Sequence, residues 1–180
     1  MPIDIAQRFL ERSRHYLHVE YPAKIELALR TIPAAQLWWR PNERANSAGN
    51  LVLHLCGNVR QWIVSGVGGT PDTRTRDAEF AARDGADHAA LVQLLRHTCD
   101  VVDATLARLS ADMLSEARSI QGRDTTVLAA IYHVVEHFSG HTGQIILIAK
   151  WLTPGAVQFY DDTAGLARPT FLGAGQHDID

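Results

Sequence analysis

The chain of 180 residues is 46% hydrophobic and 21% charged, a balance that excludes disordered and fibrous proteins and suits a single domain over residues 1–180. Its net charge of −3 offers no general attraction for nucleic acid. No stretch reaches the roughly 18 apolar residues of a membrane span. Asp4 and Arg8 interrupt the N-terminal apolar residues, where a secretory signal would be continuous. We therefore expect a cytoplasmic protein with neither a nucleic-acid nor a membrane partner.

The first half of the chain predicts two long helices. Apolar residues recur at helical spacing over residues 3–30, and Pro22 should kink or split the helix that they predict. Residues 38–42 break the pattern. Asn46 or Ser47 can then cap a second helix that runs to about Ser65, where several glycines follow.

The second half predicts a loop and two further helices. Residues 70–86 are polar and aperiodic, so we expect a long loop there and assign it no chemistry. A third helix should begin near Asp87 and bury one apolar face up to Leu109. Asp124 can cap a fourth helix that continues to Leu152, where a proline and a glycine end it.

These elements predict an all-α fold, a four-helix bundle joined by short to moderate connections. No segment alternates with period two over enough residues to predict a sheet. We expect residues 153–180 to form an irregular tail that wraps the bundle and frays at its end. Cys56 and Cys99 lie in apolar helical patterns, which indicates two buried hydrophobic residues in a reducing compartment and no disulfide.

Histidines on the predicted fourth helix are the main chemical signal. His137 and His141 are four residues apart, so both rings can point toward one ion from a single helix face. A pair alone makes a weak site, because transition metals in proteins usually take at least three protein ligands. His54 lies beside the apolar stripe of the second helix and completes a three-histidine site if the two helices are neighbours.

Two stretches of the sequence carry a family resemblance. Residues 46–58, NSAGNLVLHLCGN, and residues 137–145, HFSGHTGQI, resemble the two signature helices of the DinB-like superfamily. The order of the histidines and the H-x-x-x-H-x-G-Q spacing both agree. The resemblance implies an up-and-down bundle with unusual connectivity, a divalent ion such as nickel or zinc, and often a homodimer. Some relatives resemble metal-dependent transferases that use low-molecular-weight thiols.

Other interpretations of the histidines remain open. The rings of His137 and His141 can instead be core groups that hydrogen-bond to carbonyls. Residues 133–137 also match the inverted zincin pattern H-x-x-E-H, in which His133 and His137 bind the metal and Glu136 is the general base. His133 and His141 are about 12 Å apart along the helix axis, so one ion cannot easily take both. We therefore predict His54, His137 and His141 as ligands and His133 as a pocket residue.

Two amides also lie at helical spacing from the predicted ligands. Gln144 follows His141 by three residues and Asn58 follows His54 by four, so each can orient a ligand ring or a substrate, or simply tie helices together. Cys56 points about 200° away from His54 round a regular helix and is not expected to bind the ion.

Three neutral ligands leave open positions on a divalent ion, and zinc, nickel and iron all accept imidazole. We expect a metal-dependent transferase or hydrolase that acts on a small molecule, and the family resemblance adds a low-molecular-weight thiol. No general base is evident within the signature helices, which favours thiol transfer over hydrolysis. The alternative is a non-catalytic metal- or small-molecule-binding protein with a stress-response role. A metal site that only stabilises the fold is a third hypothesis.

Overall fold

The computed structural model describes residues 4–163, 165 and 167–172. The first predicted helix is present as one continuous helical segment that begins after Asp4. Helix α1 (Ile5–His15) passes through a π-helical stretch, η1 (Tyr16–Glu20), into α2 (Tyr21–Thr31). Pro22 lies in the first turn of α2, where a missing N–H is tolerated. The proline therefore follows a local widening of the helix and does not break it.

The second predicted helix is also present, and its capping explains where it begins. After a short 3-10 turn, η2 (Ala34–Gln36), helix α3 (Ala48–Val59) continues as the π-helical η3 (Arg60–Val67). Ser47 is the N-cap, and Ser47 and Asn50 bond reciprocally in a capping box.

We expected residues 70–86 to form a long loop, but the structure shows that they contain the short helix α4 (Arg76–Ala81). The buried amide of Asn50 donates to the carbonyl oxygens of Glu79 and Ala82 at 2.8 and 2.9 Å. These bonds fasten α4 to α3 without any apolar periodicity, which is why the sequence pattern gave no sign of a helix.

The prediction of no sheet is wrong for residues 117–126. Helix α5 (His88–Leu106) begins next to Asp87, as predicted, and Asp87 is its N-cap. It leads through a 3-10 turn, η4 (Ala111–Ser115), to strands β1 (Ala117–Ile120) and β2 (Arg123–Thr126). The strands pair antiparallel around Gln121 and Gly122, which both have positive φ, the geometry of a tight hairpin. Strands of four residues are too short to show clear alternation.

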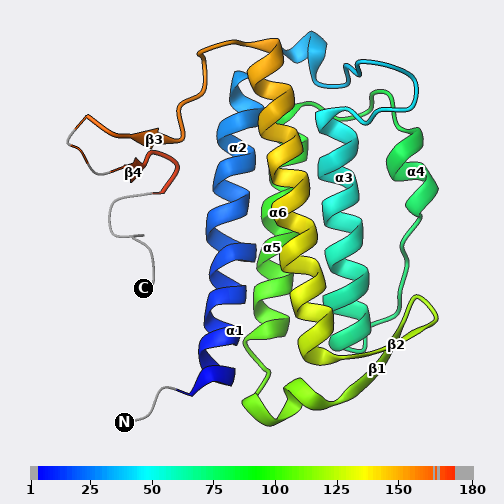
Figure 1. Cartoon of the computed structure of the whole chain (residues 1–180). Helices are drawn as coiled ribbons and strands as arrows, with labels where there is room; N and C mark the ends of the chain where they lie inside the picture. The colour runs from blue at the N-terminus through cyan, green and yellow to red at the C-terminus, as the bar shows by residue number, and fades with distance from the viewer. Residues whose placement is uncertain (1–3, 164, 166, 173–180) are drawn as a thin grey trace.

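Helix α6 (Val127–Leu152) packs against α2 and α3. Asp124 lies in β2, so the hairpin displaces the predicted cap, and Thr126 caps α6 instead. Figure 1 shows α6 between α2 and α3, with α5 behind it. Its buried face carries large apolar side chains of the core, Ile131, Val134, Phe138, Ile145 and Ile148.

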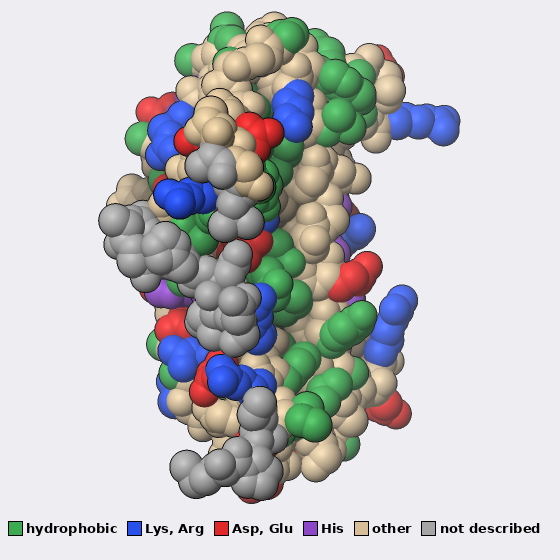
Figure 2. Space-filling model, turned by 60° about the vertical axis from the view of Figure 1, so that its left-hand side comes forward, with side chains coloured by type: hydrophobic (Ala, Val, Ile, Leu, Met, Phe, Trp, Pro, Cys, Tyr) green, Lys and Arg blue, Asp and Glu red, His purple; other side chains and the backbone are tan. Residues whose placement is uncertain are grey.

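The described part of the C-terminal tail contains a small antiparallel pair, β3 (Tyr160–Asp161) and β4 (Arg168–Pro169), beside α2 in Figure 1. The predicted frayed end, residues 173–180, lies outside the described residues. Positive and negative side chains are interspersed among the described residues of the face in Figure 2, with hydrophobic groups between them. No described helix is long and apolar enough to cross a membrane. The described chain is thus mostly helical, and the all-α bundle is confirmed.

Candidate metal-binding site

The structure brings together the three histidines that the sequence singled out. His54 comes from α3, and His137 and His141 come from neighbouring turns of α6. One ligand atom from each ring lies within 4.8 Å of the other two. His54 is buried and the other two are half-buried, so the cluster lies at the edge of the core with one side open to solvent.

The spacing of the ring nitrogens suits a shared ion. The Nε2 atoms of His54 and His137 are 3.1 Å apart. Two imidazole nitrogens bound at about 2.0–2.1 Å to one ion, with angles between 90° and the tetrahedral value, lie roughly 2.8–3.4 Å apart. The two Nε2 atoms are therefore at a distance that allows both to bind one ion. The same distance allows the two nitrogens to share one proton in a hydrogen bond.

Gln144 orients the third ring. Its Oε1 accepts a hydrogen bond from Nδ1 of His141 at 2.7 Å. An amide oxygen only accepts, so Nδ1 carries the hydrogen and Nε2 of His141 keeps its lone pair. Gln144 thus fixes the orientation of the His141 ring by a hydrogen bond.

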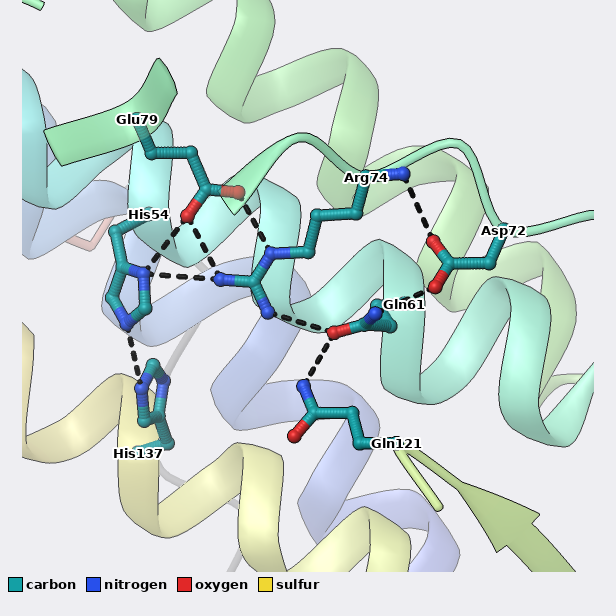
Figure 3. Close-up of polar contacts among 7 residues, drawn as sticks. All are labelled: His54, Gln61, Asp72, Arg74, Glu79, Gln121 and His137. Atoms are coloured by element: carbon teal, nitrogen blue, oxygen red, sulfur yellow. Dashed lines mark hydrogen bonds and ion pairs between the residues drawn. The ribbon is translucent and has the colours of Figure 1, made fainter. Parts of the chain in front are cut away.

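Glu79 and Arg74, which the sequence analysis missed, fix the ring of His54. Nδ1 of His54 donates to Oε2 of Glu79 at 3.0 Å, which leaves Nε2 facing His137. Arg74 binds both carboxylate oxygens of Glu79, from Nε at 2.7 Å and from Nη2 at 2.8 Å. Figure 3 shows the guanidinium lying against both the carboxylate and the imidazole. This is the carboxylate–histidine arrangement that commonly supports metal ligands.

A second layer of polar contacts holds Arg74 in place. Nη1 of Arg74 donates to Oε1 of Gln61 at 2.9 Å, and Gln121 of the hairpin turn donates to the same oxygen. Gln61 in turn donates to Asp72, whose other oxygen accepts from the backbone N–H of Arg74. Figure 3 shows this chain of contacts running from His137 to Gln121. Gln61 thus contacts the guanidinium directly, and Gln121 and Asp72 hold Gln61 in place.

Gly57 makes room for the carboxylate. A Cβ atom built on Gly57 would lie 1.9 Å from Oε1 of Glu79 and 3.1 Å from Nε of Arg74. Any side chain at this position on α3, one turn beyond His54, would push the ion pair away. On the other side of His54, the ring of Phe80 lies 4.6 Å from the imidazole.

Comparisons with known proteins agree with this fold. The model of the family described as "Protein of unknown function (DUF1572)" matches residues 4–160. The chain belongs to this family. No curated protein matches this DUF1572 chain. Among solved structures, it is similar to a DinB-like protein, YjoA, from Bacillus subtilis, with a TM-score of 0.59 and 19% identity over 78% of this chain and 90% of that one. At this identity the match shows the fold alone, and it confirms the DinB-like resemblance at that level.

The remaining residues that the sequence named in this DUF1572 protein lie outside the histidine cluster. The ring of His133 is 5.6 Å from that of His137 but 4.2 Å from that of Trp62. His133 does not belong to the group whose ligand atoms converge, which weighs against the inverted zincin pattern, and Glu136 is exposed. Asn58 is buried, and its Oδ1 has no hydrogen-bond partner among the described residues. Cys56 is buried, and burial raises its pKa to about 12.

The electrostatics of the site favour neutral imidazoles beside an ionised carboxylate. Burial, together with the neighbouring His141 and His54, lowers the pKa of His137 to about 3. Burial also lowers the pKa of His141, although the Gln144 hydrogen bond opposes it. Burial alone would raise the pKa of Glu79, but the bonds from Arg74 and His54 outweigh it and the pKa is lowered. Neutral imidazole is the form that binds metals.

These shifts predict that the metal-free protein loses stability as the pH falls below about 6.5, the ordinary pKa of histidine. Between that value and a pKa of about 3, the unfolded chain binds a proton at His137 that the folded chain does not. The free energy of unfolding should therefore fall with pH by up to about 1.4 kcal/mol per unit for this group. Urea unfolding of chelator-treated protein at a series of pH values measures the slope.

The variant His137→Asn should show a shallower slope over the same range, and His97→Asn, at an exposed position on α5, controls for the loss of one histidine. Equal slopes for the wild type and His137→Asn would contradict the assignment of this pH dependence to His137.

Proposed function

We propose that His54, His137 and His141 bind one divalent transition-metal ion, with zinc, nickel and iron as candidates, and that the chain is a metal-dependent transferase or hydrolase of a small molecule. The observation that carries the proposal is the convergence of three ligand atoms within 4.8 Å from two helices. The hydrogen bonds that orient His54 and His141 support it, because metal-binding histidines almost always donate their other N–H to an acceptor.

A divalent ion at these residues supplies Lewis acidity and lowers the pKa of a water or thiol ligand. Glu79 is poorly suited to serve as a general base, because both its oxygens accept from Arg74 and its pKa is lowered. A thiol nucleophile needs less help with proton transfer than water does. We therefore favour transfer to or from a low-molecular-weight thiol over hydrolysis.

The second candidate is a non-catalytic metal- or small-molecule-binding protein with a stress-response role. The same three histidines would bind the metal in that case. The ion pair with Arg74 supports this candidate, because it occupies the carboxylate of Glu79 that could otherwise act as a base. The two functions differ in turnover. Metal-loaded protein assayed with thiols and electrophiles, and with esters and amides, should show an activity that His54→Ala abolishes only if the chain is an enzyme.

The metal content of purified variants tests the ligand set. Elemental analysis should find about one equivalent of metal in the wild type and in His133→Ala, and little in His54→Ala, His137→Ala or His141→Ala, because two imidazoles alone bind weakly. Loss of metal in His133→Ala with retention in His54→Ala would instead support the inverted zincin pattern.

Glu79→Gln should weaken metal binding by roughly 10- to 100-fold, because a neutral amide orients His54 less firmly and no longer pairs with Arg74. Gly57→Ala should act in the same direction by displacing the carboxylate. Competition with a chromophoric chelator measures both affinities. Glu136→Gln is the matched control, since Glu136 is exposed one residue before His137. Affinities for Glu79→Gln and Gly57→Ala equal to that of the control would exclude a positioning role for Glu79.

We further propose that the chain forms a homodimer through the outer side of α6. Four large apolar side chains are exposed there, at 44% for Leu128, 64% for Tyr132, 46% for Leu147 and 58% for Trp151. Exposed apolar groups along one helix are typical of interaction surfaces. Light scattering coupled to size exclusion should give twice the chain mass for the wild type and the monomer mass for Tyr132→Glu/Trp151→Glu. A monomeric wild type would refute the dimer.

A further inference from the structure

Arginines line a pocket next to the histidine cluster. The pocket has a volume of about 420 Å³, and its walls include Arg40, Arg44, Arg76 and Arg83. Two of these residues precede α3, and two belong to or follow α4, so the fold gathers them from segments more than 30 residues apart in the sequence. One carboxylate, that of Glu43, also lines the pocket.

The charge of this pocket is unbalanced. Among the described residues, the recorded ion pairs engage Arg8, Arg14, Arg74, Arg96 and Arg118 but none of the four pocket arginines. Four arginines and one glutamate thus line the pocket in a chain whose net charge is −3. Like charges gathered in a pocket raise the local concentration of ions of opposite sign.

The arginines are held in ways that leave donors available. Nη1 of Arg83 donates to the carbonyl oxygens of Phe80 and Ala82, and Nη1 of Arg40 donates to that of Glu43. The guanidinium of Arg76 stacks on the ring of Phe80 at 4.9 Å. Each guanidinium has five N–H donors in a planar fork, a geometry that matches carboxylate and phosphate groups.

Two residues connect the pocket to the histidine cluster. Phe80 lines it and contacts the ring of His54. Arg44 also lines a second pocket of about 350 Å³, whose walls include Gln144, the partner of His141. An anionic group held among the arginines would therefore be separated from His54 by Phe80 and from His141 by Gln144.

We propose that the arginine-lined pocket binds the anionic group, a carboxylate or a phosphate, of the small molecule that reacts at the histidine cluster. This assignment rests on the proposed function and names its substrate class, a small organic anion. Arg44 and Arg76 are specificity-determining residues in this assignment, because they line the pocket, whereas Arg40 and Arg83 already donate to backbone carbonyl oxygens.

Calorimetry on the full chain, stripped of metal by a chelator, tests the pocket separately from the metal. Succinate and inorganic phosphate are the two probes, at low ionic strength, where exposed charges act most strongly. Binding of at least one probe is expected in the wild type, and Arg44→Gln/Arg76→Gln should weaken it by about tenfold or more, since hydrogen bonds to charged groups are lost. The probe that binds more tightly distinguishes a carboxylate site from a phosphate site.

Two controls decide between the possible outcomes. Arg108→Gln, at an exposed position beyond the end of α5, should bind the probe like the wild type. His137→Ala should lose metal but keep anion binding. The proposal would be overturned if neither probe bound the wild type, or if Arg44→Gln/Arg76→Gln bound the probe as tightly as the wild type. It would also be overturned if His137→Ala lost anion binding while the double arginine variant kept it. Anion binding at the arginines in a chain that takes up no metal would refute the metal function while leaving the pocket in place. Circular dichroism confirms that each variant is folded.

Discussion

The buried ion pair between Arg74 and Glu79 is the interaction on which the rest of the site depends. The side chains are 4% and 10% exposed, so both charges have lost most of their water. Such a pair is tolerated only when nearly every donor and acceptor is satisfied. Here the carboxylate accepts from Arg74 and His54, and the guanidinium also reaches Gln61.

The same ion pair positions two different parts of the site. The segment around α4 has no apolar face of its own to pack, so polar contacts to α3 hold it, including the bonds from Asn50. Once held, the segment places Glu79 on Nδ1 of His54 and Phe80 against its ring. It also places Arg76 at the pocket wall. The orientation of a proposed metal ligand and the proposed recognition of an anion therefore share one structural cause.

The sequence predicted the four long helices and the grouping of the three histidines, but not α4, the hairpin or the residues that orient His54. Four-residue spacing alone places His137 and His141 on one face of α6, and the partnership with His54 needed only that α3 and α6 be neighbours. Glu79 lies 25 residues from His54 in a polar segment, and no periodicity links the two. Gly57 was visible within the signature stretch, but only the structure shows which atom occupies the space beside it. The single-domain assignment stays a prediction.

X-ray absorption at the metal edge of the purified, metal-loaded chain tests the central claim most directly, since it reports the ligands themselves. The account predicts a first shell that contains three imidazole nitrogens at about 2.0–2.2 Å, with any remaining ligands light atoms from solvent. His54→Ala, which we expect to bind metal only weakly, should show one imidazole fewer when the metal is supplied in excess. A first shell with sulfur from the protein, or a spectrum unchanged by His54→Ala, would contradict the convergence of α3 and α6 on one ion.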